Sequence, residues 1–253
     1  LVEQRGSFRR IHLWAWRLLE RVFFRARGGR DVGGEVEGLG GGEERIRGGR
    51  GGLLVGAHQG SWEALRALGA RCADGPLRVV LDKQKTPALT AVLESLAPDV
   101  GAAVIDASLG GTSVALAMAE SAAQGDMVAL LADRGHQGEA SRIVPFLGSP
   151  APFPVGPWLL ASALKIPVML CMGIYLGGDR YRLIFEPFTE SLDIPRAGRA
   201  AALDEIVGRY ASRIEHYCRA YPFNWFNFYD FWQEMGPADE PTAAAGVPRR
   251  SDA

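Results

Sequence analysis

The chain has 253 residues, of which 47% are hydrophobic and 23% charged, and its formal net charge is −1. These values are typical of a globular protein with one large or two small domains, and they argue against a nucleic-acid partner. The three cysteines lie far apart, so neither a disulfide framework nor a cysteine metal site is expected. No secretory signal pattern opens the chain, and whether residues precede Leu1, a membrane anchor among them, stays open.

The first predicted element is an amphipathic helix over Phe8–Phe24. Its apolar residues recur at helical spacing, and the eight arginines from Arg5 to Arg30 face only one acidic residue, Glu20. Such a helix could pack on its own domain. It could also lie at a membrane surface, where arginine meets anionic headgroups and tryptophan sits at the interface.

Residues 28–52 are rich in glycine and charge, and a short hairpin around Val32–Leu39 is the element expected there. The glycines do not form a GxGxxG frame between a strand and a helix, so no dinucleotide site is expected.

From Leu53 onward strands and helices alternate, which predicts a layered α/β single domain with a central, mostly parallel or mixed sheet flanked by helices. The apolar run over 158–177 is long enough to span a membrane, but Lys165 and Pro167 interrupt it, which favours a buried helix followed by a buried strand. Beyond Trp232 apolar periodicity ends, and a disordered tail is expected. The predicted strands are Gly52–Gly56, Leu77–Leu81, Ala103–Ile105, Met127–Ala132, Val168–Leu176 and Tyr181–Phe185. The predicted helices are Trp62–Cys72, Thr86–Leu96, Gly111–Gln124, Pro157–Leu164 and Arg199–Ala220.

A histidine and a carboxylate, His58 and Glu63, lie at the first strand-to-helix junction. Gly56 and Gly60 allow tight backbone geometry there, and Ser61 is a candidate N-cap that places Glu63 in the first turn of the helix. Histidine titrates near neutral pH, and a carboxylate can fix its tautomer, so the pair is a candidate general base with its orienting group. Taken alone, this spacing is also common by chance.

Three further stretches carry candidate functional residues. Asp133 and Arg134 follow an apolar strand, at the end where open α/β sheets bind ligands, although a structural ion pair is the alternative. The proline-rich stretch Val144–Pro157 is predicted to be a stiff apolar loop, either a connector or the approach to a helix N-terminus that binds an anion. The aromatic stretch Tyr221–Trp232 could pack as core, line an acyl tunnel or sit at a membrane interface.

In this order the stretches resemble the lysophospholipid acyltransferase superfamily, and more narrowly its branch related to the lipid A biosynthesis late acyltransferases. The resemblance covers about 53–232, and the glycine-rich 28–52 departs from it. The matching motifs are His-x4-Asp/Glu at His58 and Glu63, Asp-Arg/Gln at Asp133 and Arg134, Phe-Gly/Leu-Gly with Pro-x-Gly-Pro within Phe146–Pro157, and Pro-x-Gln/Asn-Trp with aromatics at Pro222–Trp232.

The resemblance implies an acyltransferase domain over 53–235, between a lead-in over 1–52 and a tail over 236–253. It implies that a fatty acyl group moves from a thioester of coenzyme A or acyl carrier protein to a hydroxyl or amine of a lipid or glycolipid acceptor. His58 would be the general base, Glu63 would orient it, N–H groups near Gly60 would bind the oxyanion, and Arg134 would position a phosphate. The substrate-binding residues implied are Gly60, Ser61, Asp133, Arg134, Phe146, Gly148, Pro154 and Gly156.

No metal, no cofactor beyond the acyl thioester and no covalent acyl-enzyme are expected, and the expected location is the cytoplasmic face of the inner membrane. Two other functions fit the same residues. The base could activate water in an acyl-thioester hydrolase, or the fold could serve as a silent lipid-binding module, against which His58 and Glu63 argue. The acceptor, the acyl chain length, the acyl carrier and the oligomeric state stay open.

Overall fold

The computed structural model of the chain describes residues 33–37, 51–62, 64–65, 76–84, 104–135, 138–178, 180–227 and 231–232. The predicted amphipathic helix, the predicted helix over 86–96 and the predicted disordered tail lie outside these residues. The predicted helix over 62–72 is described only at its start, where Trp62, Ala64 and Leu65 are helical.

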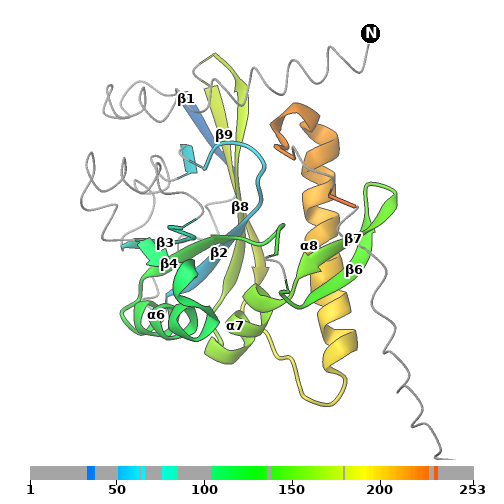
Figure 1. Ribbon diagram of the computed structural model, residues 1–253. Helices are drawn as coiled ribbons and strands as arrows, with labels where there is room; N and C mark the ends of the chain where they lie inside the picture. The colour runs from blue at the N-terminus through cyan, green and yellow to red at the C-terminus, as the bar shows by residue number, and fades with distance from the viewer. Residues whose placement is uncertain are drawn as a thin grey trace, which may run out of the picture.

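A seven-stranded mixed sheet forms the centre of the described part (Figure 1). Its strand order is β1-β9-β8-β2-β5-β3-β4, and every neighbouring pair is parallel except β8 with β9. The predicted fold class is therefore confirmed. The strands are β1 (Gly33–Glu37), β2 (Gly52–Gly56), β3 (Leu77–Leu81), β4 (Val104–Asp106), β5 (Met127–Leu131), β8 (Val168–Gly177) and β9 (Arg180–Thr189).

The central strands are apolar on both faces, as is typical of a sheet covered on both sides. Every residue of β2 is buried. Successive side chains of a strand point to opposite faces, so Leu53 and Val55 belong to one hydrophobic cluster and Leu54 to the other. The same alternation holds in β5, where Val128 joins the first cluster and Ala129 the second.

The described helices α6 (Gly111–Ala123), α7 (Gly156–Leu164) and α8 (Arg199–Ala220) cover the same face of the sheet (Figure 1). Each contributes buried residues to the first cluster, with Met118 from α6 and Trp158 from α7 both fully buried. The long helix α8 has the bounds that the sequence predicts. Two short 3-10 turns, η1 (Ala107–Leu109) and η2 (Pro222–Asn224), precede α6 and follow α8, respectively.

The prediction of a hairpin around Val32–Leu39 is wrong. The described residues there form the single strand β1, which pairs in parallel with β9, Val36 lying opposite Leu183. An isolated two-stranded hairpin is marginally stable, whereas β9 offers β1 a sheet edge to extend. The Arg182 guanidinium of β9 contacts the Glu35 carboxylate of β1 at 2.8 Å and adds an exposed ion pair to this register.

The prediction of a proline-rich loop over 144–157 is also wrong. This stretch forms most of an antiparallel hairpin, β6 (Ser141–Phe146) and β7 (Ser149–Pro154), followed directly by α7. Leu147 and Gly148 connect the two strands with φ angles of 52° and 90°. Two consecutive positive φ angles are the geometry of a two-residue hairpin turn.

Prolines are compatible with this hairpin because of the positions that they occupy in its hydrogen-bond ladder. The pair that flanks the two-residue turn, Phe146 with Ser149, is a hydrogen-bonded pair, and such pairs alternate with non-bonded ones along the ladder. Pro145 and Pro150 form the next pair, where a missing N–H costs the ladder nothing.

The hairpin packs against α8 (Figure 1). Two guanidinium nitrogens of Arg142 lie 2.6 Å from the carboxylate oxygens of Asp204, and the Leu147 N–H donates to Glu215 at 2.8 Å. On the inner face Phe153 is fully buried, with its ring 5.9 Å from that of Tyr210. The hairpin is thereby held along the length of the helix.

Candidate active site

Two polar residues, His58 and Asp133, extend from neighbouring parallel strands at one edge of the sheet. His58 follows β2 and Asp133 follows β5, and the last residues of these strands, Gly56 and Leu131, are register partners. Carboxyl ends of parallel strands meet at the same edge, which is the edge that binds ligands in open α/β sheets. Both residues thus lie at the strand ends where their sequence context predicts them.

Both carboxylate oxygens of Asp133 are directed at His58. Oδ1 lies 2.8 Å from the imidazole Nδ1, and Oδ2 accepts the backbone N–H of His58 at 3.0 Å. The Asp133 side chain is 1% exposed, whereas that of His58 is 36% exposed. A buried carboxylate therefore holds an imidazole ring that is itself partly accessible from outside the protein.

This contact assigns the tautomer of His58. An ionised carboxylate only accepts hydrogen bonds, so Nδ1 carries a hydrogen and the lone pair of the neutral ring lies on Nε2. Burial would raise the pKa of Asp133, but the charge and hydrogen bonds of His58 and the charge of Arg134 outweigh it, and the pKa lies below its usual value. Asp133 therefore remains a carboxylate at neutral pH.

Glu63, the predicted orienting carboxylate, lies outside the described residues, so its role stays a prediction. Asp133, which the sequence analysis placed among the substrate-binding residues, instead makes the described contact with the Nδ1 atom of His58. The sequence signal was that Asp133, like His58, follows an apolar strand; that these two strands are neighbours in the sheet comes from the structure.

The loop after His58 is fixed by backbone hydrogen bonds. The Gly60 N–H donates to the Asn224 carbonyl at 2.8 Å, and the Ser61 N–H donates to the Gly173 carbonyl. Gly60 has a φ of 73°, and a Cβ there would overlap the Gly173 carbonyl oxygen, so only glycine fits. The N–H groups of Gly60 and Ser61, expected to bind the oxyanion or the substrate, are thus already used within the protein. The Ser61 hydroxyl accepts the Ala64 N–H at 3.1 Å, as expected for an N-cap.

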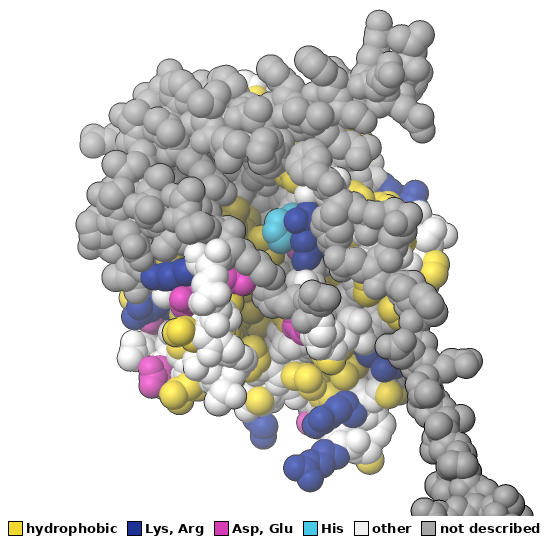
Figure 2. Space-filling model, viewed as in Figure 1, with side chains coloured by type: hydrophobic (Ala, Val, Ile, Leu, Met, Phe, Trp, Pro, Cys, Tyr) yellow, Lys and Arg dark blue, Asp and Glu magenta, His cyan; other side chains and the backbone are white. Residues whose placement is uncertain are grey.

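The aromatic terminal segment crosses this loop. The Phe226 N–H donates to the His58 carbonyl at 2.9 Å, and Arg134 donates through Nη2 to the Phe226 carbonyl at 2.5 Å. Arg134, expected to position a phosphate, therefore joins the terminal segment to the strand end that carries Asp133. In Figure 2 a histidine side chain lies beside a basic one on the displayed face.

Most described rings of the terminal stretch pack as core. The Trp225 and Phe231 rings each lie 5.5 Å from the Phe146 ring of the hairpin, and all three residues are buried. Packing is therefore the role that the structure gives these rings, among the three that the sequence left open.

The remaining predicted binding residues belong to other surroundings. Phe146 and Pro154 are buried, and Gly148 lies in the hairpin turn. Gly156 begins α7, where an anion was expected, but a Cβ on Gly156 would lie 2.7 Å from Oε1 of Glu139. A carboxylate of the chain itself already occupies the space beside this helix start.

Two supporting residues, Tyr210 and Asn224, received no role from the sequence, although Asn224 lies in the Pro-x-Gln/Asn-Trp motif. The Tyr210 hydroxyl donates to the Gly56 carbonyl at the end of β2 at 2.8 Å. Burial raises the pKa of Tyr210 well above its usual value, so the hydroxyl keeps its hydrogen. The helical spacing of Tyr210 indicated burial, but no sequence signal indicated the partner of its hydroxyl.

The two described cysteines are poor candidates for a covalent intermediate. Both Cys171 and Cys218 are buried. Burial raises the pKa of Cys171 to about 12 and also raises the pKa of Cys218. Because the thiolate is the reactive form, neither thiol is activated at neutral pH.

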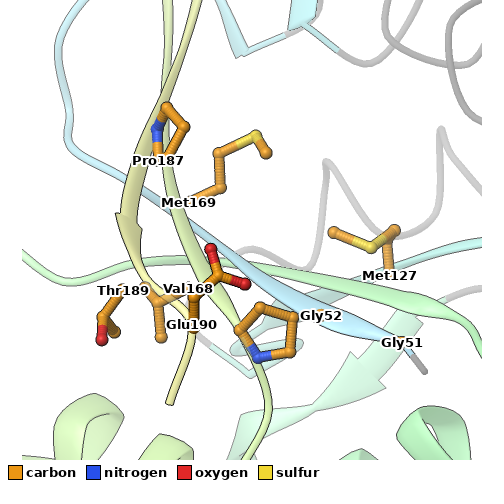
Figure 3. A pocket seen from close by; sticks show the side chains of 9 residues that line it. Gly51, Gly52, Met127, Val168, Met169, Pro187, Thr189 and Glu190 are labelled. Atoms are coloured by element: carbon orange, nitrogen blue, oxygen red, sulfur yellow. The ribbon is translucent and has the colours of Figure 1, made fainter. Parts of the chain in front are cut away.

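A small, mainly apolar pocket lies at the opposite end of the sheet (Figure 3). Gly52, Met127 and Val168 line it, and each is at the start of its strand. Since His58 follows the other end of β2, this pocket does not adjoin the site. Among the described residues no group of histidine, cysteine and carboxylate side chains could hold a metal ion, and no described helix is long and apolar enough to cross a membrane.

Comparison with known proteins supplies the identity. No curated protein matches the chain. The sequence profile of the family described as bacterial lipid A biosynthesis acyltransferase matches residues 13–234, which include the whole of the site. The chain therefore belongs to the bacterial lipid A biosynthesis acyltransferase family and is an acyltransferase.

Proposed function

We propose that the protein moves a fatty acyl group from an acyl thioester, of coenzyme A or acyl carrier protein, to a hydroxyl or amine of a lipid or glycolipid acceptor, with His58 as the general base. The observation that carries this proposal is the contact between Nδ1 of His58 and buried Asp133. It leaves Nε2 of a half-exposed ring as the proton acceptor.

In the proposed reaction Nε2 of His58 takes the proton of the acceptor group as its oxygen or nitrogen attacks the thioester carbonyl. The resulting tetrahedral intermediate collapses, the C–S bond breaks, and the imidazolium returns the proton to the leaving thiolate. The carboxylate of Asp133 stabilises the imidazolium while it exists. General base assistance of this kind contributes about 10²- to 10⁴-fold to a rate.

Glu63 is a second carboxylate near the same histidine, five residues after it in the sequence. Two carboxylates cannot both accept the Nδ1 hydrogen in the same way, and the described contact belongs to Asp133. We therefore propose that Asp133 fixes the tautomer. Glu63 then adds negative charge that favours the imidazolium, or contacts the acceptor.

A labelled acyl thioester incubated with bacterial lipid extract tests the reaction. Label transferred to a lipid supports the proposed function. Free fatty acid as the only product would replace it with thioester hydrolysis, in which water takes the place of the acceptor. Bound lipid without any turnover would indicate a silent binding module. Separate reactions with acyl-coenzyme A and acyl carrier protein identify the donor.

A further inference from the structure

Asn224 is the last residue of η2, and its side-chain amide forms hydrogen bonds of the kind that a neighbouring strand forms with its backbone. Its Oδ1 accepts the Tyr175 N–H at 2.8 Å, and its Nδ2 donates to the Tyr175 carbonyl at 3.2 Å. Both backbone groups of one residue of β8 are thus bound by one amide. The residue is 7% exposed, so these hydrogen bonds are shielded from water.

The backbone that follows Asn224 pairs with the loop that carries the proposed base. The Asn224 carbonyl accepts the Gly60 N–H at 2.8 Å, and the Phe226 N–H donates to the His58 carbonyl at 2.9 Å. Between these two bonds Gln59 and Trp225 form an antiparallel bridge. Residues 224–226 are therefore a short partner strand for residues 58–60.

These contacts leave the backbone of His58 little freedom. Its N–H donates to Asp133 and its carbonyl accepts the Phe226 N–H. The Cα atom that carries the imidazole is therefore held by hydrogen bonds on both sides. The partner strand is in turn held at one end by Arg134 and at the other by the amide of Asn224. Loss of that amide would release the end of the partner strand that fixes Gly60.

We propose that Asn224 is a positioning residue for the acyl transfer: its amide anchors residues 224–226 to β8, and this segment holds the His58 imidazole on Asp133. The inference rests on the proposed role of His58 as the base. Asn224 acts through His58 and touches neither donor nor acceptor, so its loss should impair the chemical step and leave substrate binding intact.

The test compares three variants with the unmodified protein. Asn224→Ala removes both side-chain bonds, and Asn224→Gln keeps the amide on a longer arm. Ser162→Ala is the matched control. Like Oδ1 of Asn224, the Ser162 hydroxyl accepts one backbone N–H, that of Ile194 at 3.1 Å. Ser162 lies on α7, away from His58. Each is assayed for kcat and KM of label transfer, and the hydrogen-bonded Nδ1–H of His58 is followed by NMR.

We expect Asn224→Ala to lower kcat about 10²-fold with little change in KM, because a displacement of about 1 Å at a reacting group has this effect. The Nδ1–H resonance should be lost as well. Asn224→Gln should recover much of kcat and the resonance, and Ser162→Ala should keep both. If the alanine variant does not fold, Asn224→Leu, which has a similar shape and no hydrogen-bonding group, replaces it with the same expected results.

Normal kcat and a normal Nδ1–H resonance in the alanine variant, or an equal loss of kcat in Ser162→Ala, would overturn the inference. These results differ from failure of the proposed function, in which the unmodified protein itself transfers no label. In that case the NMR measurement still decides whether Asn224 positions His58.

Discussion

At the scale of single residues, the Asp133 carboxylate contacts His58 at two points. One carboxylate binds the ring and the backbone N–H of the same residue. Such a two-point contact fixes the ring plane as well as the tautomer, which is what a general base requires before substrate arrives.

Replacing Asp133 by asparagine should lower kcat/KM for label transfer about 10²- to 10⁴-fold. The asparagine amide can donate to Nδ1, which would place the hydrogen on Nε2 and remove the acceptor from the reacting side. Glu63→Gln is the comparison, and its effect should be smaller. A larger loss in Glu63→Gln than in Asp133→Asn would assign the orienting role to Glu63.

The lowered pKa of Asp133 also predicts how stability depends on pH. The folded-state pKa lies below the unfolded value, so this carboxylate stabilises the fold above the unfolded pKa and loses that contribution as pH falls through the folded one. The difference in free energy of unfolding between the unmodified protein and Asp133→Asn should therefore shrink below about pH 4. Urea denaturation at a series of pH values measures it, and a constant difference would contradict the assigned shift.

At the scale of elements, the apolar strands and the long helix could be predicted from sequence because burial leaves a periodic pattern. The bounds predicted for β2, β3 and α8 are those of the structure. The hairpin β6–β7 could not be predicted, because Pro145 and Pro150 indicate an interrupted strand as long as their pairing register is unknown. Once a two-residue turn fixes that register, both prolines lie in a non-bonded pair.

The helix α7 ends on a residue that is strained for its conformation. Lys165, the C-cap, has φ 52° and ψ 38°, a left-handed conformation that costs a side-chain-bearing residue about 1–2 kcal/mol. Lys165→Gly should therefore raise the free energy of unfolding by about 0.5–1 kcal/mol, since the unfolded chain gains entropy that offsets part of the relief. Denaturation curves measure this, with Lys165→Ala as the control. An equal gain in the alanine variant would show that the backbone conformation is not the cause.

At the scale of the whole molecule, the site is assembled from segments far apart in the chain. His58 lies 75 residues from Asp133, and Arg134 lies 92 residues from Phe226. Strand ends in sequence were enough to predict that His58, Asp133 and Arg134 lie at the ligand-binding edge of the sheet, but not that β2 and β5 are neighbours. The hydrogen bonds of Asn224 could not be predicted, because nothing in an aromatic stretch shows which backbone groups its amide will meet.

We also expect the arginines between Arg5 and Arg30 to bind the protein to anionic lipid, as their local excess of positive charge indicates. Neutralising one arginine that lies near the membrane surface should weaken vesicle binding by about 1 kcal/mol, or about fivefold. Co-sedimentation with anionic vesicles at low and high salt measures it. The control replaces the exposed Arg196 and Arg199 by glutamine. Vesicle binding that changes neither with salt nor when an arginine between Arg5 and Arg30 is neutralised would contradict this expectation.

The most direct test of the central claim is the rate of label transfer by His58→Gln, measured beside His216→Gln. His216 is an exposed histidine on α8 and serves as the matched control. Because glutamine cannot take a proton at neutral pH, we expect His58→Gln to fold normally and to lose at least about 10²-fold in kcat, while His216→Gln keeps the full rate. Near-normal transfer by folded His58→Gln would contradict the role of His58 as the general base.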